Sequence, residues 1–250
     1  FIVDVRRQNM LLHLMYKALF ELSGDRTDFL SRLFARPMPP EMHAANPEHL
    51  FAVLSKTPSD PDMAKATLDS ILERLRDHHH FELSNEDSTS IEHVYNAFVS
   101  AGPEIRYSFP NQYAWRRFPT YSELMLETDG TTENGGEQQS YIASEENFRA
   151  IQRMESENRI VPIVGDFAGE KALRSVGQYI RNHDATVSTF YTSNVEFYLF
   201  QTEDWRKFLD TVSALPMTTE STVIRSYFNN YGLQFPSPPA WLDSPSNSGA

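Results

Sequence analysis

Residues 1–24 read FIVDVRRQNMLLHLMYKALFELSG, and they decide how the rest of the chain is interpreted. The run before Asp4 is apolar, contains β-branched residues and is too short for a helix, so it predicts a buried strand that ends at the acid. Residues 8–24 carry apolar side chains at helical spacing on two faces, which indicates a helix packed on two sides and stopped by Gly24. A strand, a short polar turn and a buried helix make half of a βαβ unit.

The next block, residues 25–143, has a different character. Asp60 and Pro61 supply the cap and the first position of a helix, and residues 88–102 carry a second strong helical pattern. Residues 103–128 are aromatic and irregular, and a polar, glycine-rich stretch follows them. The block therefore predicts a mostly helical insertion with a long loop.

Regular alternation of helices and strands resumes near residue 144. Ser144, followed by two glutamates, starts a helix, and an apolar strand then ends at Gly165 and Asp166. A further helix, a strand that turns at Asn194, another helix and a last strand complete the pattern. Together with the opening strand and helix, this alternation predicts a parallel sheet with right-handed connections.

The predicted fold class is therefore α/β: a mostly parallel, Rossmann-like sheet flanked by helices, with a largely helical insertion. Residues 1–24 are the first strand and helix of the α/β domain, and residues 25–143 are the insertion. Residues 144–233 are the remainder of the α/β domain, and residues 234–250 are a tail rich in proline and serine.

Composition excludes several function classes. The formal net charge is -12, from 34 acids against 22 bases, which disfavours binding to nucleic acid or to an anionic membrane. The chain has no cysteine, which rules out disulfides, cysteine-ligated metals and thiol catalysis. No apolar run reaches the roughly 18 residues that span a bilayer. We expect a cytoplasmic protein, although the periplasm suits a cysteine-free chain equally, and the oligomeric state is not predicted.

Polar side chains occur where the predicted strands end. Asp4, Asp166 and Asn194 each follow a strand, and the carboxyl ends of parallel strands meet at one crevice. A carboxylate at such a position can accept hydrogen bonds from both hydroxyls of a ribose, because it offers two acceptors side by side. The alternative is that Asp4 caps the following helix or pairs with Arg6 or Arg7, and that Asp166 caps a turn.

Several of these motifs resemble known proteins. FIVDVRRQNML is similar to the second strand and turn of class I S-adenosylmethionine-dependent methyltransferases, and VPIVGDFAG and ATVSTFYTSNVE are similar to their later strands. More closely, nearly the whole chain resembles an uncharacterised bacterial family with a methyltransferase-like Rossmann fold. This resemblance implies S-adenosylmethionine as the cofactor, with Asp4, Val5 and Asp166 binding it. It also implies a preceding strand and a glycine loop; the sequence contains neither G-x-G-x-x-G nor G-x-G-x-G, so the loop either lies upstream of residue 1 or is absent.

The stretch TSNVE supplies the candidate catalytic residues. In the methyltransferases that modify nitrogen, an Asn/Asp-Pro-Pro-aromatic motif often stands here, and Asn194 lacks the prolines. The Asn194 carbonyl can orient an amine or hydroxyl nucleophile, and Glu196 can act as a base if burial raises its pKa. The alternative is a turn followed by a helix cap.

Two further segments contain residue types that occur in binding sites. Three consecutive histidines, His78, His79 and His80, cannot share one helix face, so we expect no metal site and interpret them as a polar helix end. Arg116 and Arg117 lie among aromatic residues that form either a lid over the pocket or the insertion's own packing.

The sequence therefore favours a methyltransferase-like protein that acts on a small molecule, without deciding whether the chain is an enzyme. The alternative is a non-catalytic, Rossmann-like binding or scaffold protein that has lost the cofactor loop. A metal-dependent hydrolase that uses the histidines is a third, less favoured hypothesis.

Overall fold

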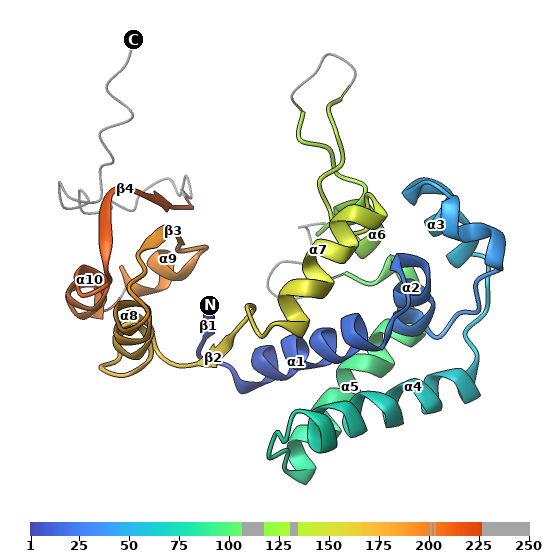
Figure 1. Ribbon diagram of the computed structural model, residues 1–250, viewed down its shortest axis with the longest axis horizontal. Coiled ribbons are helices and arrows are strands. Elements are labelled where there is room, and N and C mark those ends of the chain that lie inside the picture. The colour runs from blue at the N-terminus through green and yellow to red at the C-terminus, as the bar shows by residue number, and fades with distance from the viewer. Residues whose placement is uncertain (107–117, 131–134, 201, 203, 227–250) are drawn as a thin grey trace. The chain divides into compact units, whose positions relative to one another are not determined.

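The computed structural model describes residues 1–106, 118–130, 135–200, 202 and 204–226. The chain divides into two compact units (Figure 1). The helical unit is Gln8–Val161, and the strand unit joins Phe1–Arg7 to the described residues from Pro162 onward. The predicted lid residues Arg116 and Arg117 and the predicted tail at 234–250 lie outside the described residues.

The helical unit holds most of the helices. In chain order they are α1 (Arg7–Leu22, whose first residue belongs to the strand unit), α2 (Arg26–Phe34), η1 (Pro40–Ala44), α3 (Pro47–Leu54), α4 (Pro61–Glu73), the π-helix η2 (Arg74–His78), α5 (Asn85–Ala101), η3 (Gly102–Glu104), α6 (Tyr121–Met125) and α7 (Glu145–Ser156). Capping residues in the sequence explain where several of these helices begin. The Asp60 carboxylate accepts hydrogen bonds from the first turn of α4, and Ser84 and Asp87 form a capping box before α5.

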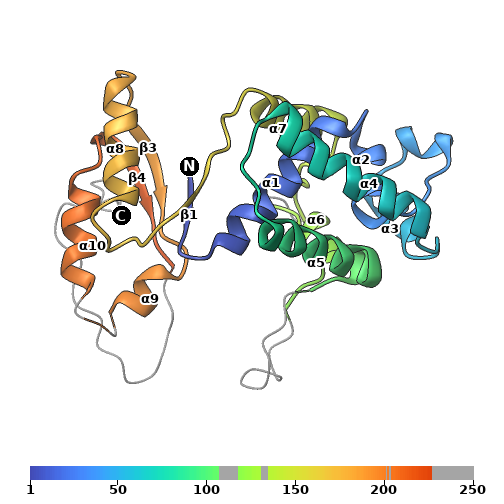
Figure 2. The ribbon, with the colours of Figure 1, turned by 90° about the horizontal axis from the view of Figure 1, so that it is seen from below.

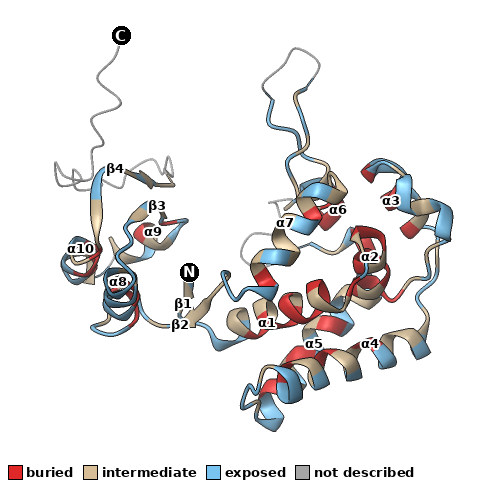
Figure 3. Ribbon diagram, viewed as in Figure 1, coloured by how far each residue is buried: buried red, intermediate tan, exposed pale blue. Residues whose placement is uncertain are grey.

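The core of the helical unit forms around α1, which lies between α7 and α5 in both views (Figures 1 and 2). Buried residues gather on α1, α2 and α5 (Figure 3). Phe29 of α2 is fully buried and stacks on Phe20 of α1 at 4.6 Å, and Phe20 stacks on Phe148 of α7 at 5.3 Å. The Tyr95 hydroxyl of α5 donates to the Arg32 carbonyl oxygen at 2.7 Å. The two apolar faces of α1 are therefore both covered by other helices.

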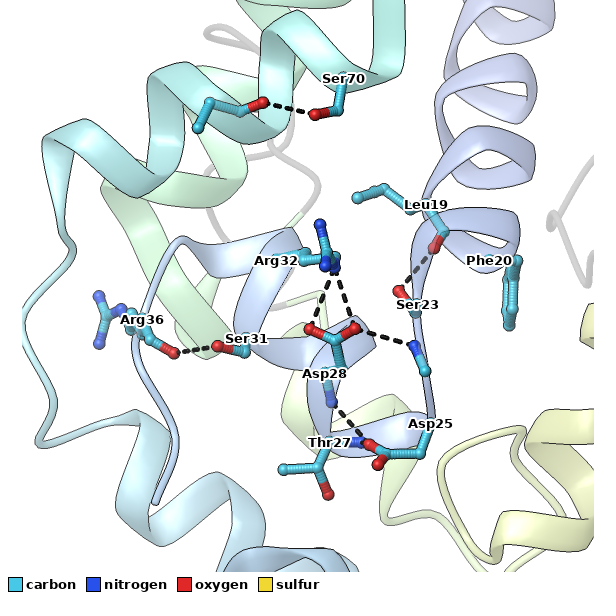
Figure 4. Close-up of polar contacts among 12 residues, drawn as sticks. Leu19, Phe20, Ser23, Asp25, Thr27, Asp28, Ser31, Arg32, Arg36 and Ser70 are labelled. Carbon is cyan, nitrogen blue, oxygen red and sulfur yellow. Dashed lines mark hydrogen bonds and ion pairs between the residues drawn. The ribbon is translucent and has the colours of Figure 1, made fainter. Parts of the chain in front are cut away.

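The corner between α1 and α2 is fixed by short polar contacts (Figure 4). Asp25 Oδ1 accepts from the N–H groups of Thr27 and Asp28, both at 2.8 Å, which caps α2. The Asp28 carboxylate accepts from the Gly24 N–H at 2.8 Å and from Arg32 Nε at 3.0 Å. These bonds satisfy N–H groups that the break between the two helices would otherwise leave open.

The buried side chain of Arg26 connects this corner by hydrogen bonds to loops that are distant in the sequence. The Arg26 guanidinium donates to the carbonyl oxygens of Ile142 at 2.7 Å, Ala143 at 3.2 Å and Ala45 at 2.6 Å. Only 7% of Arg26 is exposed. A planar fork of donors suits this role because it can reach several carbonyl oxygens at once.

The strand unit is smaller. It contains β1 (Ile2–Asp4), β2 (Pro162–Val164), α8 (Ala172–Asn182), β3 (Val187–Tyr191), α9 (Val195–Leu199), α10 (Asp204–Ser213) and β4 (Met217–Ile224). Strand β1 pairs in parallel with β2, and β3 pairs in parallel with β4. A cluster centred on Leu173 of α8 and Phe208 of α10 packs against Val3 of β1 and Phe190 of β3. One small apolar cluster therefore supports strands from both pairs.

The predicted fold class is wrong. The described residues contain four strands, arranged as two separate pairs, and not one Rossmann-like sheet flanked by helices. The larger core is formed by helices and the turns between them, without any of the four strands, and it includes α1, which we expected to pack on a sheet. The parallel direction within each pair was expected, but β1 and β2 are only three residues long each. Alternating local patterns predict strands and helices, but they do not determine how many strands pair with one another.

Within the described ranges, none of the helices combines the length and apolar character that a bilayer crossing requires.

Candidate functional site

The carboxyl ends of β1 and β2 lie at one edge. Asp4 is the register partner of Val164, and the Gly165 N–H extends the pairing by donating to the Asp4 carbonyl oxygen at 2.9 Å. Asp166 is the next residue along the chain. The structure therefore brings Asp4 and Asp166, two residues predicted to bind the cofactor, to the same strand edge.

The Asp4 carboxylate is held by its neighbour. Oδ1 accepts from the Arg6 backbone N–H at 2.7 Å and from Arg6 Nε at 3.1 Å, and Oδ2 accepts from Arg6 Nη2 at 3.1 Å. The side chain of Arg6 is 57% exposed, against 27% for Asp4. This is the pairing that the sequence left open as the alternative to ribose binding. Val5, between them, is 60% exposed.

Asp166 organises the turn into α8. Its Oδ1 accepts from the Ala168 N–H at 2.9 Å, and its carbonyl oxygen accepts from the Gly169 N–H at 3.1 Å. Gly165 lies tightly against the helix, because a Cβ placed there would come within 2.2 Å of the Ala172 Cβ. Glycine at this position lets the end of β2 pass directly against the first residue of α8.

A hollow opens where β2 ends and α8 begins. Its volume is about 630 Å³, and it is lined by residues 163–166, residues 169–172 and Ser175. Asp166, Glu170, Lys171 and Ser175 give it both acidic and donor groups. Lys171, the N-cap residue of α8, makes no side-chain capping bond, and first-turn N–H groups of a helix are donors that a ligand can use.

The predicted catalytic residues lie at a different strand end. Asn194 takes the N-cap position of α9 without a side-chain capping bond, and Glu196 is only 5% exposed. Arg225, which follows β4, donates through Nε to both Glu196 carboxylate oxygens at 2.9 Å. This ion pair joins the ends of β3 and β4. The structure thus places Asp4 and Asp166 at one strand edge and Asn194 and Glu196 at another.

A second polar cluster lies in the helical unit, and sequence reasoning did not assign it. Lys17 and Glu21, one turn apart on α1, form an ion pair at 2.8 Å, and their side chains are 5% and 6% exposed. Glu21 Oε2 lies 2.6 Å from His79 Nε2 and 3.9 Å from Arg74 Nη1. Lys17 also donates to the Glu155 carbonyl oxygen. Two opposite charges one turn apart within an apolar helical pattern were the available sequence signal for this cluster.

Burial changes the proton affinities of the two acids in this cluster. Burial raises the pKa of Glu21, but the hydrogen bonds from His79 and Lys17 outweigh it and leave the pKa below its ordinary value. Burial raises the pKa of Glu155 to about 7, because the charge of Lys17 opposes the shift only in part. Glu155 therefore titrates near neutrality, whereas Glu21 stays a carboxylate.

One comparison with known proteins gives a match. The family model described as Domain of unknown function (DUF7790) matches residues 1–247. None of the curated proteins matches the chain.

Proposed function

The chain belongs to the DUF7790 family, and we propose that it binds S-adenosylmethionine beside the carboxyl ends of β1 and β2 and supports methyl transfer to a small molecule. The observation that carries the proposal is the parallel register, which brings Asp4 and Asp166 to one edge next to the hollow at the start of α8. The choice of ligand comes from the resemblance of FIVDVRRQNML and VPIVGDFAG to class I methyltransferases. The proposed binding site uses only the β1–β2 pair and the start of α8, and so does not require a Rossmann-like sheet.

The groups around the hollow fit such a ligand chemically. A carboxylate at Asp4 can accept from two neighbouring hydroxyls, and Asp166 and Glu170 can offset the charge of a sulfonium. The first-turn N–H groups of α8 and the Lys171 ammonium can donate to the carboxylate of the ligand's amino-acid part. Donors and acceptors are therefore both present within a few residues.

Bound S-adenosylmethionine would supply an electrophilic methyl group. The chain's own contribution would be to hold the ligand and orient an acceptor, since in-line transfer needs few proton-transfer groups. Arg225 donates to both carboxylate oxygens of Glu196, so the proposal assigns Glu196 no proton-transfer step. Asn194 lies at the other strand edge, so its predicted role of orienting the acceptor is not part of this proposal.

Arg6 has to yield before Asp4 can hold a diol. Its side chain is mostly exposed, so it can move into solvent at low cost, and exposed ion pairs contribute only about 0–1 kcal/mol. Arg6 would then act as a competitor for the same carboxylate. This gives the proposal a matched pair of variants.

Calorimetric titration of the chain with S-adenosylmethionine and S-adenosylhomocysteine tests the proposal. We expect micromolar binding that D4N weakens at least tenfold, because the amide loses one acceptor and the charge. R6A removes the same ion pair but keeps the carboxylate, so it should bind as tightly as the wild type or more tightly. D166N should weaken binding less than D4N, because Asp166 also serves the turn.

Absence of heat with both ligands would overturn the proposal. Equal weakening by D4N and R6A would overturn it too, because it would show that only the integrity of the Asp4–Arg6 pair matters. Circular dichroism of each variant confirms that the chain remains folded.

A binding protein without catalysis is the second candidate. The Glu196–Arg225 pair favours it, because this pair engages the one predicted base of the sequence. Formation of S-adenosylhomocysteine in the presence of a panel of small amines and alcohols separates the two: an enzyme produces it above the no-protein rate, and a binding protein does not.

A further inference from the structure

The end of helix α4 departs from regular geometry at the histidine run. The helix continues from Glu73 into the π-helical turn Arg74–His78, and the His79 N–H closes it by donating to the Arg74 carbonyl oxygen at 3.1 Å. His80 then adopts a positive φ of 56° and turns the chain away. Short π-helical segments are frequent at functional sites. The three histidines therefore do not follow a regular helix.

This turn brings two of the histidines together with an acid. The ligand atoms of Glu21, His78 and His79 all lie within 4.8 Å of one another. The His78 and His79 rings are 4.7 Å apart and inclined at 69°, so their nitrogens can face a common point without stacking. The expectation that consecutive histidines cannot share a helix face still applies to all three. It does not apply to two histidines at a π-helical end and a carboxylate from another helix.

We propose that Glu21, His78 and His79 form a binding site for a divalent cation of the zinc class. Two imidazole nitrogens and one carboxylate oxygen suit zinc, cobalt or nickel, whereas calcium and magnesium prefer oxygen ligands only. Metal–ligand distances of about 2.0–2.2 Å require the side chains to close in on the ion. His78 is exposed and can turn, while Glu21 and His79 are largely buried and hold the site in place.

The surroundings support a carboxylate that binds through one oxygen. Lys17 lies at 2.8 Å from Glu21 Oε1, on the other side of the carboxylate from His79, and its own position is fixed by the Glu155 carbonyl oxygen. An ion-paired partner at one oxygen can orient a ligating carboxylate in the same way as an outer-shell hydrogen bond. Oε2, which now faces His79, is the oxygen left for the ion. The cation would replace the hydrogen bond between Glu21 and His79.

The competing explanation is a purely structural ion pair. Lys17, Arg74 and His79 all surround Glu21, and this alone can account for a buried carboxylate. The two explanations differ in the role of His78, which makes no hydrogen bond to Glu21 in the described part of the chain and would be dispensable in an ion pair. They also differ from non-specific binding to surface histidines, for which the adjacent His80 is a matched control.

Zinc titration of the tag-free full chain by calorimetry, with cobalt(II) absorbance as a second readout, tests this site. We expect one ion per chain with a dissociation constant below about 10 μM, in the range that three protein ligands can give. H78A, H79A and E21Q should each weaken binding at least tenfold, and H80A should change it less than twofold. Cobalt should give the visible bands of a low-coordinate site, and E21Q or H78A should remove them.

Failure of the wild-type chain to bind zinc would overturn the proposal. Binding that H80A weakens as much as H78A would overturn it as well, because that result describes a flexible histidine run. If E21Q bound zinc with unchanged affinity, the Glu21 carboxylate would not be a ligand, and the site as proposed would be wrong. H78A changes an exposed side chain, so its result stands even if H79A or E21Q loses part of the fold.

Discussion

The two units bury apolar surface on different scales. In Gln8–Val161, twenty buried residues form one cluster, and many of them are fully inaccessible aromatic and leucine side chains. In the strand unit, five buried residues form the corresponding cluster, and large apolar side chains such as Tyr191 and Ile224 remain exposed. The strand patterns in the sequence predicted a sheet, but among the described residues most of the buried apolar side chains belong to the helical unit.

Removal of the central aromatic of the larger core should have the largest effect. Phe29→Ala deletes a ring that is fully buried and contacts Phe20, Tyr16, Tyr141 and Phe148. We expect a loss of about 4 kcal/mol in the free energy of unfolding, from lost burial and the cavity left behind. Urea denaturation measures this loss, and amide hydrogen exchange shows where it occurs. If the two cores unfold separately, amide protection in the variant should fall within residues 8–161 and persist around Phe208. An equal loss of protection in both units would contradict this.

Glu155 should make the helical unit less stable as the pH rises. Its pKa is about 7 in the folded chain against an ordinary value of 4.5, so the folded state binds this proton more tightly than the unfolded state. The stabilisation from the protonated form is complete below pH 4.5 and is lost as the pH rises through about 7. We expect a decrease in the free energy of unfolding of about 3 kcal/mol across this window, at about 1.36 kcal/mol for each pH unit.

Denaturation of wild type and E155Q at several pH values tests this prediction. The neutral amide mimics the protonated acid, so E155Q should lose this part of the pH dependence and should be the more stable chain at pH 8. A variant with the same slope as the wild type would show that another group is responsible.

The ion pair of the strand unit should have an intermediate effect. Arg225→Met leaves the Glu196 carboxylate, 5% exposed, without its guanidinium partner. We expect a loss of about 2 kcal/mol, below the 3–5 kcal/mol of a fully buried pair because Arg225 is partly exposed. The double variant R225M/E196Q should recover part of it. If the double variant regains stability, the loss in R225M comes from the unpaired buried charge of Glu196. If it does not, the loss comes from the packing of the Arg225 side chain.

The smallest expected effect is at a helix cap. Asp25→Ala removes the acceptor for the N–H groups of Thr27 and Asp28 at the start of α2. A loss of about 1 kcal/mol is typical of such caps. Asp60→Ala at the start of α4 serves as the comparison, since Asp60 accepts the same two kinds of bond. Both losses should appear in thermal melts, and a neutral D25A would show that the packing of α2 makes its cap redundant.

Local features of the fold could be predicted from sequence, and long-range ones could not. The start of α4 after Asp60, the start of α7 after Ser144 and the strand that ends at Asp4 are confirmed, because each depends on neighbouring residues, but Ile2 of this strand is exposed and not buried as predicted. The number of paired strands depends on hydrogen bonds between distant segments, which periodicity does not encode. The same limit applies to the site. Asp4 and Asp166 could be placed at strand ends, but the pairing of Glu196 with Arg225 joins residues 29 apart.

The π-helical turn at Arg74–His78 was the least predictable feature. A regular helix directs consecutive histidines to different sides, and nothing in DHHHF indicates the wider turn. The position of Glu21 opposite this turn depends on the packing of α1, which is again a long-range property.

The three bonds that the Arg26 guanidinium donates have a consequence for how the chain can change. All three end on main-chain oxygens, at Ala45, Ile142 and Ala143, whereas the backbone N–H of Arg26 donates to the Glu145 side chain. Every amino acid offers that oxygen, so these three hydrogen bonds do not themselves require particular side chains at Ala45, Ile142 and Ala143, although Ile142 is also buried in the larger core. Arg26 itself has no equivalent replacement, because only arginine presents such a planar fork of donors.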